Sequence, residues 1–151
     1  MPERETIKRA RRDKRQGKAA STQAGEFVRE EMDHIREGKH GARSTKQAIA
    51  IGLSKARRAG VKLGKPPASA KASTKRSAAS ASRRSRSDRR PSTRRSRGVK
   101  RALKREGRSA ASRKSLSRQA RSAAHRRSAA QRRASARKAA RTRQRRRHAS
   151  S

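Results

Sequence analysis

The large apolar residues of this 151-residue chain are most concentrated in residues 22–60, which also contain its only Phe. Beyond residue 63 the sequence consists mainly of Arg, Ser, Ala and Lys, with few side chains that could fill a core. Such a segment cannot offset the backbone entropy lost on ordering, about 1–2 kcal/mol per residue. The sequence therefore predicts a small all-α protein, in which a helical hairpin follows a short N-terminal helix and precedes a long, mostly disordered tail.

The first hairpin helix is predicted from about residue 23 to residue 37. Thr22 is a suitable N-cap, and Gly38 stands at the position where a glycine commonly ends a helix. Glu31 falls within the apolar arc of this helix, so it requires a cation, for which Lys46 or an N-terminal Arg is a candidate. This helix carries five acidic and two basic residues and is the acidic part of the chain.

The second hairpin helix is predicted to begin at Ser44, because Ser44 and Gln47 form a capping-box pattern, and to end before Gly60. Gly52 lies beside its inner stripe, where a partner backbone could approach closely. Ile51 points the opposite way and is a candidate dimer contact. We expect these large side chains of the two helices to form the hairpin core: Phe27, Val28, Met32, Ile35, Ile49 and Leu53.

The hairpin domain, residues 21–63, has too little apolar surface to be stable alone. Units of this size usually need oligomerisation or a partner, so we expect a homodimer or a contact with another protein. The charged arm before it, residues 1–20, has a helix pattern over residues 3–16 that Gly17 ends. Its apolar stripe is one turn long, which predicts a frayed helix that docks weakly through Ile7.

The tail is predicted to have two parts. Paired prolines at Pro66 and Pro67 mark the boundary after the hairpin, and residues 64–98 form a Ser/Arg-rich linker that we expect to be disordered. Residues 99–151 are rich in Ala and Arg and contain a loose repeat, SAAHRR followed by SAAQRR. Repulsion between arginines opposes helix there, so we expect coil in the free chain and helical runs once phosphate neutralises the charge.

Charge is the strongest functional signal in the sequence. The chain has 49 Lys and Arg against 10 acidic residues, a net charge of +39. Residues 66–151 alone carry 31 bases and two acids, a net charge of +29. Such a segment releases condensed counterions from nucleic acid and binds it without sequence preference. Because the single Phe is predicted to be buried, no aromatic platform for unpaired bases remains, and duplex DNA is the expected partner.

The predicted nucleic-acid contacts are cationic residues of the second hairpin helix and of the tail. They are Arg43, Lys46, Lys55, Arg57, Arg58, Arg83, Arg84, Arg94, Arg95, Arg126, Arg127, Arg132, Arg133, Arg145, Arg146 and Arg147.

Several classes of function are not expected. The chain has no Cys, and its four histidines have no evident converging ligands, so we predict neither a metal site nor a cofactor. A chain with so little core cannot hold a preorganised catalytic site, which argues against an enzyme. No window approaches the roughly 20 apolar residues that span a bilayer, and no secretory signal is apparent, so we expect a cytoplasmic protein.

Three alternatives remain. Residues 22–60 could be a helix-turn-helix that reads a major groove, although the predicted connection is longer than the usual three or four residues. The protein could instead associate with ribosomes or other RNA through its cationic extension. It could also be an adaptor whose hairpin binds a protein and whose tail only localises it.

Two segments resemble a known family. Residues 21–63, STQAGEFVREEMDHIREGKHGARSTKQAIAIGLSKARRAGVKL, and the earlier ETIKRARRDKRQGK resemble small basic bacterial proteins of unknown function. The resemblance covers residues 5–63 and implies a domain boundary and a bacterial source, but no activity. The tail is similar in composition to the basic termini of linker histones and of bacterial histone-like proteins. Together these resemblances imply a histone-like protein of the bacterial nucleoid.

Overall fold

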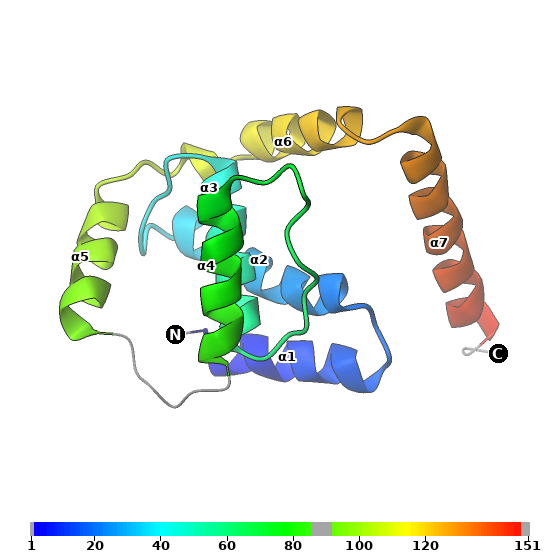
Figure 1. Ribbon diagram of the computed structural model, residues 1–151, viewed down its shortest axis with the longest axis horizontal. Coiled ribbons are helices and arrows are strands. Elements are labelled where there is room, and N and C mark those ends of the chain that lie inside the picture. Colours follow the sequence, from blue (N-terminus) through cyan, green and yellow to red (C-terminus); the bar gives the residue numbers. More distant parts are fainter. Residues whose placement is uncertain (1, 86–91, 149–151) are drawn as a thin grey trace. The chain divides into compact units, whose positions relative to one another are not determined.

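The computed structural model describes residues 2–85 and 92–148, and in these residues the protein is helical with no strand (Figure 1). The chain divides into two compact units, residues 1–115 and 116–151. The all-α prediction is thus confirmed. The described helices are α1 (Arg4–Arg15), α2 (Ala20–Arg36), α3 (Thr45–Arg58), α4 (Ala72–Arg84), α5 (Thr93–Lys104), the 3₁₀ helix η1 (Ser109–Ala111), α6 (Arg113–His125) and α7 (Ala129–His148).

The first three helices end in the same way. Gly17, Gly38 and Gly60 have φ angles of 67°, 76° and 88°, which is the left-handed region that favours glycine. After α2, the amide of Lys39 donates to the carbonyl of His34 at 3.0 Å, and after α3 the amide of Val61 donates to the carbonyl of Ala56 at 3.0 Å. These are Schellman-type ends, and the three predicted helix stops are confirmed.

The predicted start of α3 is confirmed, whereas that of α2 is wrong. Ser44 Oγ accepts the amide of Gln47 at 3.2 Å, and Gln47 Oε1 accepts the amide of Arg43 at 2.7 Å. Helix α2 begins at Ala20, after Ala19, and no side chain caps it. Thr22 lies inside α2, because the alanine-containing segment before it is itself a good helix former.

The core lies where α1, α2 and α3 meet. Phe27, Met32 and Ile35 are buried as predicted, whereas Val28, Ile49 and Leu53 are only half-buried. The buried stripe of α3 consists of small side chains instead: Thr45, Ala48, Gly52 and Ala56.

The close approach of α2 and α3 explains this difference. A Cβ atom at Gly52 would lie 2.7 Å from Val28 Cα, so the two backbones almost touch at this point. Helices at that separation leave room between them for alanine and glycine but not for isoleucine or leucine. The prediction of a close backbone approach at Gly52 is confirmed, and Ile49 and Leu53 are consequently displaced to the flanks of the contact.

Helix α1 docks more extensively than predicted. Thr6, Ala10 and Asp13, spaced three or four residues apart, are all buried on the face that packs against α2. Arg9 Nε lies 2.7 Å from Glu26 Oε2, and Lys18 Nζ lies 2.6 Å from Asp13 Oδ1. A buried threonine and aspartate are not recognised by an apolar pattern, which is why the sequence indicated only Ile7.

Helix α4 lies in the segment that was predicted to be a disordered linker, and it packs against α3. Ala78 and Ala81, three residues apart, are buried on one face of α4. Ile51 of α3, which was expected to be exposed, is half-buried. The contact uses alanine methyl groups in place of large side chains, so no apolar periodicity marked it in the sequence.

Residues 103–111 cover the loop between α2 and α3. The amides of Gly41 and Ala42 donate to the carbonyls of Leu103 and Gly107, at 2.9 and 3.1 Å. Thr45 Oγ1 donates to the Ala110 carbonyl at 2.6 Å. Gly41 is required here, because a Cβ at this position would overlap the Glu106 carbonyl group.

The remaining tail is mostly helical where it is described, so the predicted disorder is not confirmed. Helices α5, α6 and α7 carry no buried residues, and every residue of α7 is exposed. Ser128 starts α7 with a reciprocal capping box, in which Ser128 Oγ accepts the amide of Gln131 and Gln131 Oε1 accepts the amide of Ser128. Alanine and arginine are both good helix formers, which favours helix over coil. Residues 86–91 and 149–151 of the predicted linker and tail lie outside the described residues.

Candidate nucleic-acid interface

A buried charge cluster at the α2–α3 contact determines which cations face inward. Lys55 Nζ lies 2.9 Å from Glu30 Oε1 and 2.7 Å from Glu31 Oε2, and all three side chains are largely buried. Burial alone would lower the pKa of Lys55, but its contacts with Glu31 and Glu30 outweigh burial and raise that pKa above its usual value. Lys55, a predicted nucleic-acid contact, is therefore part of the protein interior, and that prediction is wrong.

The two carboxylates of the cluster have different surroundings. Burial raises the pKa of Glu30, but hydrogen bonds from Lys55, Thr6 and the Glu3 amide outweigh burial and lower it overall. Glu31 Oε1 lies 3.2 Å from His40 Nε2. The cation beside Glu31 is thus Lys55 and not Lys46 or an N-terminal Arg, because the side chain of Lys46 is exposed on α3.

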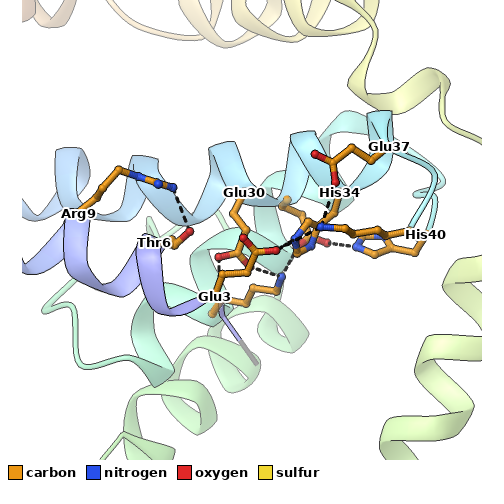
Figure 2. A network of polar contacts seen from close by, with 10 residues as sticks. Glu3, Thr6, Arg9, Glu30, His34, Glu37 and His40 are labelled. Carbon is orange, nitrogen blue, oxygen red and sulfur yellow. Dashed lines mark hydrogen bonds and ion pairs between the residues drawn. The ribbon is translucent and has the colours of Figure 1, made fainter.

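The N-terminal arm extends this cluster (Figure 2). Glu3 Oε1 lies 2.7 Å from His34 Nε2 and 3.3 Å from Lys39 Nζ, and the hydrogen bonds from His34 and Lys39 lower the pKa of Glu3. His34 pairs with Glu3 and not with an acid of its own helix, because the docking of α1 brings the arm across the end of α2.

Ion pairs occupy most of the acidic residues of the first unit. Every acidic residue that has an ion pair in the described chain is contacted by a base from residues 9–55. Even Glu106, one of two acids after residue 65, lies 3.8 Å from Arg43. The acidic helix α2 is thus neutralised locally, by bases near it in the fold, and none of its carboxylates forms an ion pair with the described part of the tail.

A second arrangement of cations lies between α3 and α4. A cavity of about 430 Å³ is lined by Ser54 and Arg58 of α3 and by Arg76, Ser77, Ser80, Ala81 and Arg84 of α4. Partial burial lowers the pKa of Arg58, and the positive charge of Arg84 lowers it further. Three arginines with serine hydroxyls around one cavity suit a phosphate group, since guanidinium binds phosphate in a bidentate manner and hydroxyls donate to its oxygens.

The sequence-predicted contacts fall into three groups. The α3–α4 cavity brings together Arg58 and Arg84 with Arg76, which was not predicted. Arg57 donates to the Gly64 carbonyl at 3.1 Å, while Lys46 is exposed and Arg43 faces Glu106. The others lie on exposed positions of the later helices and turns: Arg83 on α4; Arg94 and Arg95 on α5; Arg126 and Arg127 between α6 and α7; and Arg132, Arg133, Arg145, Arg146 and Arg147 on α7.

Two features bear on the helix-turn-helix alternative. The connection between α2 and α3 spans residues 37–44, which is longer than predicted and longer than the usual three or four residues, while α1 packs against α2 as a third helix. Of the basic residues expected on α3, Lys55 is turned inward and Arg58 lies at the α4 cavity. The exposed basic surface of α3 is therefore smaller than the sequence indicated.

Comparisons with models of protein families, with curated proteins and with solved structures found no match for this chain. In the described part of the chain, no helix combines the length and the apolar character needed to cross a membrane.

Proposed function

We propose that the protein binds nucleic acid without sequence specificity, with duplex DNA as its partner and the later helices as the main contact. One observation carries this proposal: the ion-paired carboxylates are occupied by bases from residues 9–55, while residues 66–151 carry a net charge of +29. That charge favours the binding of an external polyanion. Each neutralised phosphate releases counterions, which supplies the binding free energy.

Helix α7 supports the proposal in a second way. All of its residues are exposed, so little tertiary packing stabilises it, and such packing supplies most of the stability of helices in proteins. Phosphate would remove the repulsion between its arginines and favour the helix. We therefore propose that the tail gains helix on binding, with Ser128 defining where α7 begins.

The α3–α4 cavity would add one fixed phosphate contact to the diffuse attraction of the tail. Arg58, Arg76 and Arg84 line this cavity from two packed helices, so a phosphate there would meet cations from both helices. With the first three helices as a dimer or partner module, the protein would bridge DNA segments in a histone-like manner. The resemblance to basic bacterial proteins would place this activity in the bacterial nucleoid.

The test is a salt titration with the full-length protein and random duplex DNA. The logarithm of the association constant should fall steeply with the logarithm of the salt concentration, by about 0.9 per neutralised phosphate. The variant R126Q/R127Q/R132Q/R133Q should reduce the magnitude of that slope by about 3 to 4. Its control replaces four exposed serines, Ser73, Ser109, Ser117 and Ser122, with alanine and should retain the wild-type slope.

Two outcomes would contradict the proposal. A shallow slope for the wild type, unchanged in the arginine variant, would mean that the tail does not contact phosphate. Tighter binding to structured RNA than to duplex DNA at equal salt would favour the ribosome- or RNA-associated alternative. If neither nucleic acid binds but the first unit retains a protein partner, the adaptor alternative is favoured.

A further inference from the structure

Three potential metal ligands converge at the end of α2. Glu31, His34 and His40 each offer one ligand atom, and these atoms all lie within 4.8 Å of one another. Figure 2 shows His34 and His40 side by side, with His34 on α2 and His40 on the loop that follows it. The two rings meet edge to face, with centroids 6.0 Å apart and an interplanar angle of 87°.

The end of α2 explains this convergence. Glu31 and His34 are three residues apart and therefore lie on one helix face. Gly38, with a φ of 76°, reverses the chain, and the hydrogen bond from the Lys39 amide to the His34 carbonyl fixes that reversal. His40 is thereby returned to the face that carries Glu31. From the sequence, His40 stood nine positions after Glu31 with no sign that it would do so.

The hydrogen bonds of His40 leave a place for a cation. His40 Nδ1 lies 3.1 Å from the Gly41 carbonyl oxygen, which can only accept, so Nδ1 carries the hydrogen. In the neutral ring, Nε2 then has a lone pair that faces Glu31 Oε1 at 3.2 Å. Glu31 is fully buried, and Oε1 accepts no hydrogen bond from the described residues. Two acceptors that face each other need a proton or a metal ion between them.

The local charge favours a metal ion. Glu30 and Glu31 share the single ammonium group of Lys55, which leaves one negative charge of this pair without a lysine. Glu3 borders the cluster with Oε1 at 2.7 Å from His34 Nε2, but its charge is paired with Lys39, so the uncompensated charge is that of the buried glutamate pair. A buried uncompensated charge is destabilising, and a divalent cation beside Oε1 would remove it.

We propose that Glu31, His34 and His40 form a site for a divalent transition metal ion of the Zn²⁺ class. Two imidazole nitrogens and one carboxylate oxygen are a donor set typical of zinc. Gly41 holds the ring of His40 through its carbonyl, and the Glu3 carboxylate borders His34, as outer partners of metal-bound histidines do. The ion would tie the end of α2 to the 39–43 loop and, through the Gly41 amide, to Leu103. This inference does not depend on the proposed nucleic-acid binding.

The test uses metal-free full-length protein, titrated with Zn²⁺ by calorimetry and with Co²⁺ by visible absorption, in the absence of nucleic acid. One equivalent should bind, and a chelator should reverse it. The variant H34Q/H40Q should lose this equivalent. The matched control H125Q/H148Q removes two exposed histidines outside the cluster and should retain it. E3Q should weaken the Zn²⁺ affinity about 10–100-fold if Glu3 is an outer partner.

Two results would overturn the inference. One is the absence of stoichiometric Zn²⁺ uptake at neutral pH, which would mean that His40 and Glu31 form only a proton-mediated ion pair. The other is uptake that the control variant loses and H34Q/H40Q retains. If H34Q/H40Q does not fold, NMR of the wild-type histidine ring nitrogens decides: Zn²⁺ must shift the signals of His34 and His40 before those of His125 and His148.

Discussion

The ammonium group of Lys55 lies 2.7 Å from Glu31 Oε2 inside the contact between α2 and α3. It is also 2.9 Å from Glu30 Oε1, so one lysine compensates two buried carboxylates. Removal of one partner from a buried ion pair is strongly destabilising because the remaining charge stays in a poorly solvated place. Lys55 is therefore a structural residue in a chain whose other cations are mostly exposed.

Lys55→Met should lower the free energy of unfolding by about 3–5 kcal/mol, since it leaves Glu30 and Glu31 uncompensated. Urea denaturation followed by circular dichroism measures this change. Lys46→Met, at an exposed position of the same helix, is the control and should change the stability by less than about 0.5 kcal/mol. Equal effects of the two substitutions would show that the buried pairs are not important for stability.

The same cluster predicts how stability depends on pH. The pKa of Glu30 is lowered from 4.5, so its stabilisation is present above about pH 4.5 and is lost as the pH falls through the folded-state pKa. The pKa of Lys55 is raised from 10.5, so its stabilisation is present below about pH 10.5 and is lost as the pH rises through the folded-state pKa.

The melting temperature, measured between about pH 2 and pH 12, should therefore be constant at intermediate pH and fall at both the acid and the alkaline end. Glu30→Gln should flatten the acid limb. Glu5→Gln, which removes an exposed carboxyl group of α1, is the control for the loss of one negative charge. An acid limb that is the same in the wild type and in Glu30→Gln would contradict the assignment.

Gly52→Ala should destabilise the protein by about 1–3 kcal/mol, because the new methyl group would lie 2.7 Å from Val28 Cα and force α2 and α3 apart. Gly25→Ala is a matched control on α2. A Cβ at Gly25 meets nothing within 4 Å, and alanine is the better helix former, so this variant should be stabilised by about 0.5–1 kcal/mol. Denaturation midpoints that move in the same direction for both variants would contradict the close approach.

The three arginines that line the α3–α4 cavity should contribute more to DNA affinity than three exposed arginines elsewhere in the chain. R58Q/R76Q/R84Q should weaken DNA binding more than R94Q/R95Q/R97Q, which removes the same charge from α5. The reason is that Arg58, Arg76 and Arg84 line one cavity, so a single phosphate bound there would be close to all three. Fluorescence anisotropy at a single salt concentration is sufficient. Equal losses of affinity would mean that the cavity contributes only diffuse charge.

The sequence allowed the helix ends to be predicted but not the contacts between helices. Gly38, Gly60 and Ser44 act through local backbone geometry, so their roles can be read without knowledge of the fold. Ala78 and Ala81 bury α4 through methyl groups, which leave no large apolar periodicity. Lys55 resembles any other basic helix residue until the two glutamates opposite it are known. The capping box at Ser128 and Gln131 is a missed signal that the sequence did contain.

Only part of the candidate site could be predicted from the sequence. Charge composition alone predicts that the tail binds a polyanion. The convergence of Arg58, Arg76 and Arg84 depends on how α4 packs, and the convergence of His34 and His40 depends on the reversal at Gly38. Both are tertiary relationships that spacing along the chain does not reveal.

Residues 103–111 pack over the α2–α3 loop, and this contact affects the protein during its synthesis. Thr45 donates to a carbonyl 65 residues later in the chain. At a synthesis rate of about 5–20 residues per second, the ribosome needs roughly 3–13 s to supply that segment. During this interval the amides of Gly41 and Ala42 have only water to bond, and the end of the hairpin stays open to other chains. Codon usage between these two segments would then set how long the nascent protein remains exposed to misassembly.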